Sequence, residues 1–354
     1  MKRVSQISGF TIGFIISITL LELFLQLGEI NTVSNTEPDR VIGSRLIPNS
    51  KFLYFNEGFS IGEVNDYGYY GPSYSKKRGA QVGRIALIGD SYVEGVQVFE
   101  RNHFRNKLEN QLNQGSLSNR YEVLNFGRSG FNLNDAYCYY QNFVKQFNPS
   151  LKLIFISPGD LVDIGAVTSR PHAMLKNENI KIDYGFIKSE EYKFKESTSF
   201  FRGKSIILGY LYRILKLLKE NKYKQILFGK FALTGNENRA KNSLEKKRES
   251  LSVLTKEIIL KLRDEGCIFV LHSETRTNEY DYLLQEMKEF SEVNEVALIN
   301  LTPLFDKLKL SGINYQYWPV TNKFGHFNEI GHNEIADFLY MSLIESKRVS
   351  VDPN

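Results

Sequence analysis

The chain has 354 residues, and its 45 Lys and Arg against 40 Asp and Glu give a formal charge of +5. With 42% hydrophobic and 24% charged residues, the composition is that of a globular protein with a sizeable core, which excludes a disordered or collagen-like chain. The two cysteines, Cys138 and Cys267, are too few for a disulfide scaffold or a thiolate zinc site, although one bridge between them stays open.

The N-terminal segment predicts a membrane anchor. Residues 4–27 hold a single charged side chain, Glu22, and a helix of that length can cross the roughly 30 Å of a hydrocarbon core. A cleavable signal peptide is the alternative, but the residues that follow lack a small-x-small cleavage pattern. Lys2 and Arg3 precede the run and favour a cytoplasmic N-terminus. We therefore expect a single-pass anchor in a bacterial inner (cytoplasmic) membrane, with the body of the protein outside the cytoplasm.

Short apolar runs alternate with helical stretches through the body and predict an α/β fold. Five runs have the length and composition of strands buried on both faces: residues 84–89, 121–126, 151–157, 267–272 and 296–301. Between the first two, Phe104, Leu108 and Leu112 repeat at a spacing of four and predict an amphipathic helix. Strands linked by helices form a central parallel sheet, and functional sites gather at the carboxyl ends of such strands.

We divide the chain into five expected regions. They are a cytoplasmic tip and transmembrane anchor over residues 1–30, a tether and entry segment over 31–80, a first part of the core over 81–165, a basic helical insertion over 166–250, and a second part of the core over 251–354. The polar residues 31–40 in particular are expected to act as the tether.

The insertion concentrates the positive charge. Residues 201–250 carry 13 Lys and Arg against 4 Glu, and an apolar stripe from Ile206 to Leu218 runs beside Arg213, Lys216 and Lys219. A helical layer with a solvated outer face is the simplest interpretation. A more specific hypothesis is that this basic surface lies on anionic lipid or binds an acidic glycan. Nucleic-acid binding is disfavoured because no stacking motif accompanies the charge.

A nucleophile is predicted at the end of the first core strand. Gly89, Asp90 and Ser91 follow the apolar run and precede a helix, so the Ser91 hydroxyl and backbone N–H can both face a cleft. Asp90 is expected to brace the turn. A serine hydroxyl is a poor nucleophile at neutral pH and needs a base to activate it.

The C-terminal segment supplies the candidate base. His326 stands in a loop just before a final helix for which Asn328 is a candidate N-cap, whereas His332 falls inside that helix and is expected to be structural. The spacing of these two histidines is not the i, i+4 pattern of a zinc site, and no third ligand is evident. We therefore expect neither a metal nor another cofactor.

These residues together resemble the SGNH (GDSL-like) hydrolases, in particular membrane-anchored bacterial members. The resemblance covers about residue 65 to the C-terminus, without the insertion, and it implies a flavodoxin-like three-layer sandwich. It also implies that Ser91 is the nucleophile and His326 the base. The N–H groups of Ser91 and Gly130, with Gly127 as second choice, would form the oxyanion hole.

The sequence departs from the family pattern at two places. The third family block normally holds Asn as another oxyanion donor, and Gly159 occupies that place here. The expected triad Asp is also missing before His326, and Asn322 or a carboxylate such as Glu274 is considered as its substitute. Asp160 is expected to brace the loop.

The implied function is a serine-dependent esterase acting on acyl or acetyl groups of a cell-envelope glycan or lipid. The same Ser–His pair in an O-acyltransferase is one alternative. An inactive relative that binds glycan or a membrane acyl-transfer partner is another. A nucleotide-binding domain is disfavoured because neither a G-x-G-x-x-G motif nor a P-loop is present.

Overall fold

The computed structural model describes residues 2–27, 35–114, 120–163, 165, 169–202, 205–219, 250–272 and 281–349. Its centre is a parallel sheet of β5 (Val82–Gly89), β6 (Arg120–Gly127), β7 (Leu151–Ile156), β10 (Cys267–Leu271) and β11 (Leu298–Asn300). These are the five strands that the sequence predicts, with ends shifted by up to two residues.

The strands lie in the order β11-β10-β7-β5-β6, and every neighbouring pair is parallel. In chain order this is 2-1-3-4-5, the flavodoxin-like doubly wound order, so the expected fold class is confirmed. The order reverses at β5, because β5 pairs with β6 on one side and with β7 on the other. Ligands of doubly wound sheets bind at the carboxyl ends of the strands beside such a reversal.

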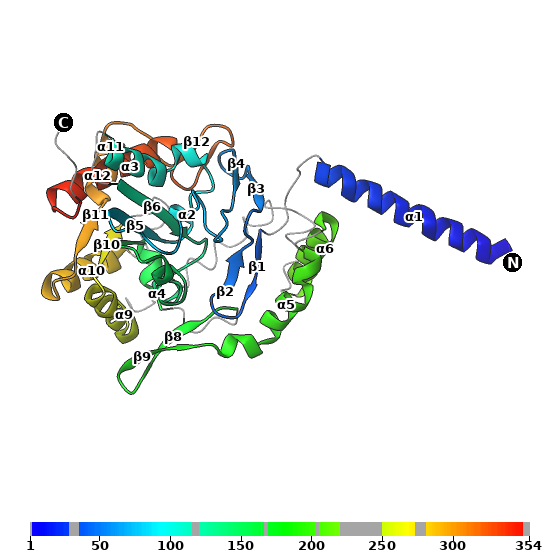
Figure 1. Ribbon diagram of the computed structural model, residues 1–354, viewed down its shortest axis with the longest axis horizontal. Coiled ribbons are helices and arrows are strands. Elements are labelled where there is room, and N and C mark those ends of the chain that lie inside the picture. The colour runs from blue at the N-terminus through cyan, green and yellow to red at the C-terminus, as the bar shows by residue number, and fades with distance from the viewer. Residues whose placement is uncertain are drawn as a thin grey trace, which may run out of the picture.

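Helices cover both faces of the sheet (Figure 1). One face packs against α4 (Leu133–Asn142), α9 (Val253–Asp264) and α10 (Asp281–Val293), and the other against α3 (Phe104–Asn113), α11 (Thr302–Leu310) and α12 (Glu329–Glu345). Side chains alternate between the faces along each strand, so that Ala86 and Ile88 point to the first layer and Ile85 and Leu87 to the second. The sequence predicts α3 and α12, and Asn328 caps α12 as expected by accepting from Ile330 and Gly331.

Shorter segments complete this core. They are α2 (Ser91–Glu94), η1 (Glu100–Asn102), η2 (Val144–Phe147), η3 (Pro158–Leu161) and the antiparallel pair β12 (Tyr317–Trp318) and β13 (Lys323–Phe324).

The segment expected to be a tether is folded where the structure describes it. The strand pairs β1 (Thr36–Asp39) with β2 (Gly43–Leu46) and β3 (Lys51–Tyr54) with β4 (Ser60–Glu63) form two antiparallel hairpins. Leu46 and Val64 are buried together with Tyr70 in a small core of their own. Of the residues 31–40 expected to act as the tether, Thr36–Asp39 are paired with β2, and backbone pairing and these few apolar side chains hold the segment on the body.

The insertion is not purely helical, which corrects the prediction. It opens with a hairpin of β8 (His172–Lys176) and β9 (Asn179–Asp183), followed by η4 (Gly185–Lys188), α5 (Glu190–Arg202) and α6 (Ile206–Lys219). The alternating exposure along β9 is the pattern of a hairpin with one covered face. Lys222, which the sequence also places off the apolar stripe of residues 206–218, lies outside the described residues.

The N-terminal helix α1 (Lys2–Leu27) projects away from the body (Figure 1). Its residues Gly9–Leu27 are long and apolar enough to cross a membrane, and none of them is buried in the protein. A signal sequence passes the same test of length and composition.

The two cysteines are free thiols buried in the core, so the bridge that the sequence left open is not formed. Burial raises the pKa of each thiol to about 12.

Candidate active site

Ser91 is the first residue of α2, directly after β5. Asp90 caps this helix, because its side chain accepts a hydrogen bond from the Tyr92 N–H at 2.9 Å. Gly95 ends the helix in the left-handed conformation with φ 60°. Asp90 thus braces the turn, as expected, and fixes Ser91 at the carboxyl end of the strand beside which the sheet order reverses.

The structure brings Ser91 and His326 together although they are far apart in the chain. The Ser91 Oγ lies 2.8 Å from His326 Nε2. The ring of Tyr92 packs against the imidazole at 4.7 Å between centroids. Nucleophile and base are therefore within hydrogen-bond reach, as a serine hydrolase requires.

Glu57 completes a triad that the sequence analysis did not find. Its Oε2 lies 2.8 Å from His326 Nδ1 and also accepts a hydrogen bond from the His326 backbone N–H at 3.0 Å. The carboxylate fixes the tautomer in which Nδ1 carries the proton and Nε2 faces the Ser91 hydroxyl. The missing acid is therefore present, but it comes from the turn between β3 and β4 rather than from the residues just before the histidine.

The turn that carries Glu57 is held against the C-terminal loop. The Thr321 hydroxyl donates to the Glu57 carbonyl at 2.8 Å, and the indole N–H of Trp318 donates to the His326 carbonyl at 3.1 Å. Gly58 lies so close to the Trp318 ring that a Cβ there would meet it at 2.2 Å. Glycine at this position lets the turn approach close enough for the carboxylate to reach the imidazole.

The residues considered as substitutes for the acid have other roles or positions. Asn322 is at positive φ, and its side-chain oxygen accepts from the Tyr317 hydroxyl at 2.7 Å. Glu57, and not Asn322, is the hydrogen-bond partner of His326 Nδ1 in the described part of the chain. Glu274 lies outside the described residues. Asp160 accepts from the N–H and hydroxyl of Ser157 and braces the loop after β7, as expected.

The backbone N–H groups of Ser91 and Gly130 are available to an oxyanion. Within the described part of the chain, no group accepts from the N–H of Ser91 or of Gly130, and Gly130 is exposed with φ 75°. The Gly127 N–H instead donates a hydrogen bond to the Asn125 side-chain oxygen at 2.9 Å. Gly127, the second candidate for the oxyanion hole, therefore has its N–H already occupied. Gly127 has a packing role, because a Cβ there would lie 2.0 Å from the backbone nitrogen of Glu94.

Gly159 lies exposed in η3, at the carboxyl end of β7. It brings no side-chain donor, so only its N–H can contribute. Removing one oxyanion donor typically costs about 10²–10³-fold in turnover.

Three of the other histidines, His103, His272 and His332, are buried. His103 accepts from the Arg105 N–H at Nδ1 and lies 3.0 Å from the Val93 carbonyl at Nε2, so it caps α3 rather than lying within it. His332 accepts from the Phe104 N–H at 3.2 Å, as the structural interpretation expected. Burial lowers the pKa of His103 to about 3 and that of His332 well below its ordinary value. No group of three or more His, Cys, Asp or Glu that would suit a metal is found among the described residues.

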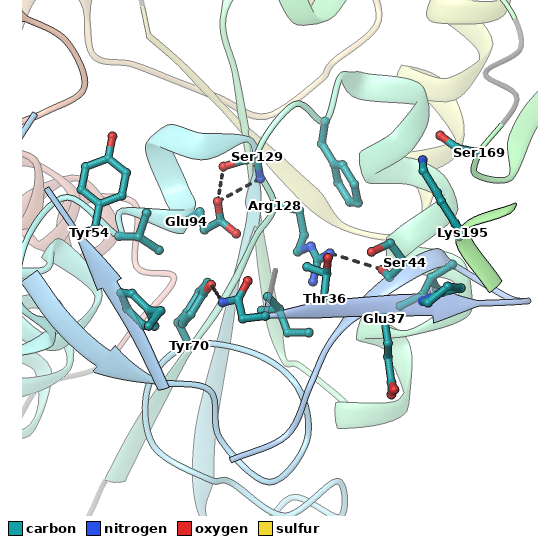
Figure 2. Close-up of a pocket in the computed structure, with 18 of the residues that line it drawn as sticks. Thr36, Glu37, Ser44, Tyr54, Tyr70, Glu94, Arg128, Ser129, Ser169 and Lys195 are labelled. Carbon is teal, nitrogen blue, oxygen red and sulfur yellow. Dashed lines mark hydrogen bonds between the residues drawn. The ribbon is translucent and has the colours of Figure 1, made fainter. Parts of the chain in front are cut away.

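A cavity of about 780 Å³ is lined by Glu94 at the end of α2, but not by Ser91, His326 or Glu57 (Figure 2). It is lined by Asn56, which precedes Glu57, and by Ser129, which precedes Gly130. Arg128 also lines it, as do Gly209 and Tyr212 of α6.

Two buried charged side chains set the polarity of this cavity. Glu94 accepts from both the N–H and the hydroxyl of Ser129, and burial raises the pKa of its carboxyl despite the nearby Arg128. The Arg128 Nη2 donates to the Ser44 carbonyl at 3.3 Å, whereas Nη1 has no hydrogen-bond partner among the described residues. The cavity therefore has buried polar groups in its wall.

The fold and the triad together define an α/β protein of the serine-hydrolase type. Among solved structures, the chain is similar to the acetyl xylan esterase AlAXEase, with 14% identity and a TM-score of 0.40 over 73% of this chain and 99% of that one. It is also similar to a lipase/acylhydrolase from Enterococcus faecalis, with 11% identity and a TM-score of 0.41 over 77% and 100% of the two chains. A third is a lipolytic protein of the G-D-S-L family from Desulfitobacterium hafniense, with 11% identity and a TM-score of 0.34 over 73% and 98%.

No family model matches the sequence, and no curated protein matches it.

Proposed function

We propose that the protein is a serine esterase that acts outside the cytoplasm on acyl esters of a cell-envelope glycan or lipid. The observation that carries the proposal is the unbroken chain of contacts from Glu57 through His326 to Ser91, with 2.8 Å at each step. A serine, a histidine within hydrogen-bond reach and a carboxylate on its far nitrogen are the parts that acyl transfer requires.

Each part has a defined task in the reaction. His326 Nε2 takes the Ser91 proton while Oγ attacks the ester carbonyl, and Glu57 stabilises the imidazolium that forms. The N–H groups of Ser91 and Gly130 hold the oxyanion of the tetrahedral intermediate. The imidazolium then returns its proton to the leaving alcohol, and a water molecule activated by the same histidine hydrolyses the acyl-enzyme.

Two features support the substrate class. The cavity of about 780 Å³ falls in the size range of small-molecule sites and has room for a sugar-sized group, and its wall includes Asn56 and Ser129, the chain neighbours of Glu57 and Gly130. The apolar helix α1, with Lys2 and Arg3 at its start, supports a body tethered on the outer side of the cytoplasmic membrane.

The test is hydrolysis of a chromogenic acetyl ester by the full chain in detergent, compared with Ser91→Ala. We expect the variant to lose turnover by about 10³-fold or more, and to lose labelling by a serine-reactive phosphonate. Ser346→Ala, which removes an exposed hydroxyl at the end of α12, is the matched control and keeps both signals. Equal ester turnover in wild type and Ser91→Ala would exclude the esterase.

The same assay separates hydrolysis from transfer. Added alcohols or sugars compete with water for the acyl-enzyme, and the ratio of new ester to free acid gives the preference. An esterase yields mainly free acid, whereas predominant new ester would reassign the protein as an O-acyltransferase.

A further inference from the structure

Helix α6 has an apolar face that the protein leaves uncovered. The large apolar side chains Leu208, Tyr210, Leu211, Ile214, Leu215 and Leu218 are between 39% and 49% exposed. The opposite face packs inward: Ile206 is buried, Gly209 and Tyr212 line the cavity, and the Tyr212 ring stacks on Phe194 of α5 at 5.5 Å. A helix with one packed face and one broad apolar exposed face needs a second apolar environment.

The start of α6 is bound to the candidate transmembrane helix. Glu22 of α1 accepts hydrogen bonds from the Ser205 hydroxyl at 2.9 Å, the Ile206 N–H at 2.7 Å and the Ile207 N–H at 3.0 Å. A carboxylate stabilises a helix N-terminus because it satisfies unpaired N–H groups and complements the helix dipole. This contact also explains the one charged residue in the otherwise apolar residues 4–27.

The position of Glu22 along α1 sets the depth of α6. At 1.5 Å per residue, Glu22 lies about 7 Å inside the carboxyl end of the apolar span at Leu27. Amphipathic helices that lie on membranes bury their apolar face about 5–10 Å into the boundary between headgroups and acyl chains. The N-terminus of α6 is therefore held at the depth at which such a helix rests.

We propose that α6 is an interfacial helix that lies on the lipid surface with Leu208, Leu211, Leu215 and Leu218 in the acyl-chain boundary. Glu22 clamps its N-terminus to α1. The abundance of Lys and Arg over residues 201–250 suits an anionic lipid surface. A consequence is that the cavity wall formed by Gly209 and Tyr212 lies within about one helix diameter, roughly 10 Å, of the lipid.

The test places an environment-sensitive fluorophore on single cysteines in the full chain, with Cys138 and Cys267 replaced by Ala. The labelled positions are Leu211 and Leu215, and Val293 at the exposed end of α10 is the control. The protein is reconstituted into phosphatidylcholine vesicles with or without phosphatidylglycerol, and emission is quenched with brominated lipid or with aqueous iodide.

We expect brominated lipid to quench the labels at 211 and 215 at least about twofold more than the label at 293, with the reverse order for iodide. Phosphatidylglycerol should increase the lipid quenching. Labels at 211 and 215 that iodide quenches as strongly as the label at 293 would overturn the proposal. Labels shielded from both quenchers would also overturn it, because a protein surface would then cover the face.

The clamp is tested by Glu22→Leu, which removes the acceptor for the α6 N-terminus, against Ser17→Ala in the same helix. Lipid quenching at 211 should fall by about half or more in Glu22→Leu and stay unchanged in Ser17→Ala. Equal lipid quenching in all three proteins would show that Glu22 does not position the helix. These readouts are independent of ester hydrolysis.

Discussion

At the scale of single residues, Glu57 gives the site its most specific test. Its carboxylate accepts from both the backbone and the ring of His326, so replacing it with an amide disturbs the tautomer while leaving the size unchanged. We expect Glu57→Gln to lower kcat for a chromogenic ester by about 10²–10⁴-fold with little change in KM. Glu63→Gln, an exposed carboxyl on β4, is the control. A kcat within twofold of wild type would show that Glu57 does not support catalysis.

Gly325 tests the same contact from the other side. A Cβ at this position would lie 2.3 Å from the carboxyl carbon of Glu57, and the glycine is not at positive φ, so Ala displaces the carboxylate without backbone strain. We expect Gly325→Ala to lower kcat by at least about tenfold while the thermal midpoint changes little. In a double-mutant cycle with Glu57→Gln, the two losses should not add, because both act through one contact. Additive losses would mean that Gly325 acts elsewhere.

Buried histidines determine how stability responds to acid. His103 and His272 each have a folded-state pKa near 3, because burial penalises the charged ring, against about 6.5 when unfolded. Between pH 3 and pH 6.5 the unfolded state binds more protons than the folded state. The two buried, neutral imidazoles therefore contribute fully to the unfolding free energy above pH 6.5, and this contribution is lost as the pH falls. At pH 5.5, each of these two histidines has lowered the unfolding free energy by about 1.4 kcal/mol relative to neutral pH. The raised pKa of Asp135, about 6, opposes part of this loss.

We expect the thermal midpoint in detergent, followed by near-ultraviolet circular dichroism, to fall between pH 7.5 and pH 5.5. His272→Leu should show a smaller fall, since one buried imidazole has been removed; His272 has no hydrogen-bond partner among the described residues. An equal fall in both proteins would exclude His272 as a source of the acid sensitivity.

At the scale of elements, the site depends on the close approach of α2 to the end of β6. Gly127 pairs with Gly89 across the two strands, and a Cβ on Gly127 would lie 2.0 Å from the Glu94 nitrogen. Because that neighbour is backbone, it cannot rotate away, and α2 must shift with Ser91 on it. We expect Gly127→Ala to reduce the unfolding free energy by about 1–3 kcal/mol and to lower kcat, measured by denaturant unfolding and ester assay. An unchanged denaturation midpoint with unchanged kcat would show that α2 accommodates the methyl group.

At the scale of the whole molecule, the site is assembled from three distant parts of the chain. The nucleophile follows β5, the base precedes α12, and the acid lies 269 residues before the base in the turn between β3 and β4. The five strands, the doubly wound class and the residues Ser91 and His326 are predictable, since each rests on a local pattern: an apolar run, a turn motif or a helix start.

Glu57 is not predictable from local pattern, because no spacing links it to His326. Only the packing of the β3–β4 hairpin on the C-terminal loop, through Gly58 and Trp318, brings the two together. Gly127 shows the same limit: its sequence context is that of an oxyanion glycine, and only the tertiary structure shows that its N–H is already donated to Asn125.

The sequence by itself predicted the strands, their class of sheet, Ser91 and His326 as a candidate pair, and an apolar N-terminal helix, because periodicity, composition and short motifs are local properties. The tertiary structure decided the acid of the triad, the available oxyanion donors and the contact between Glu22 and α6, because each joins groups remote in the chain. Such contacts depend on how whole helices and strands pack. That packing is determined by many side chains spread along the chain, so no short stretch of sequence contains it.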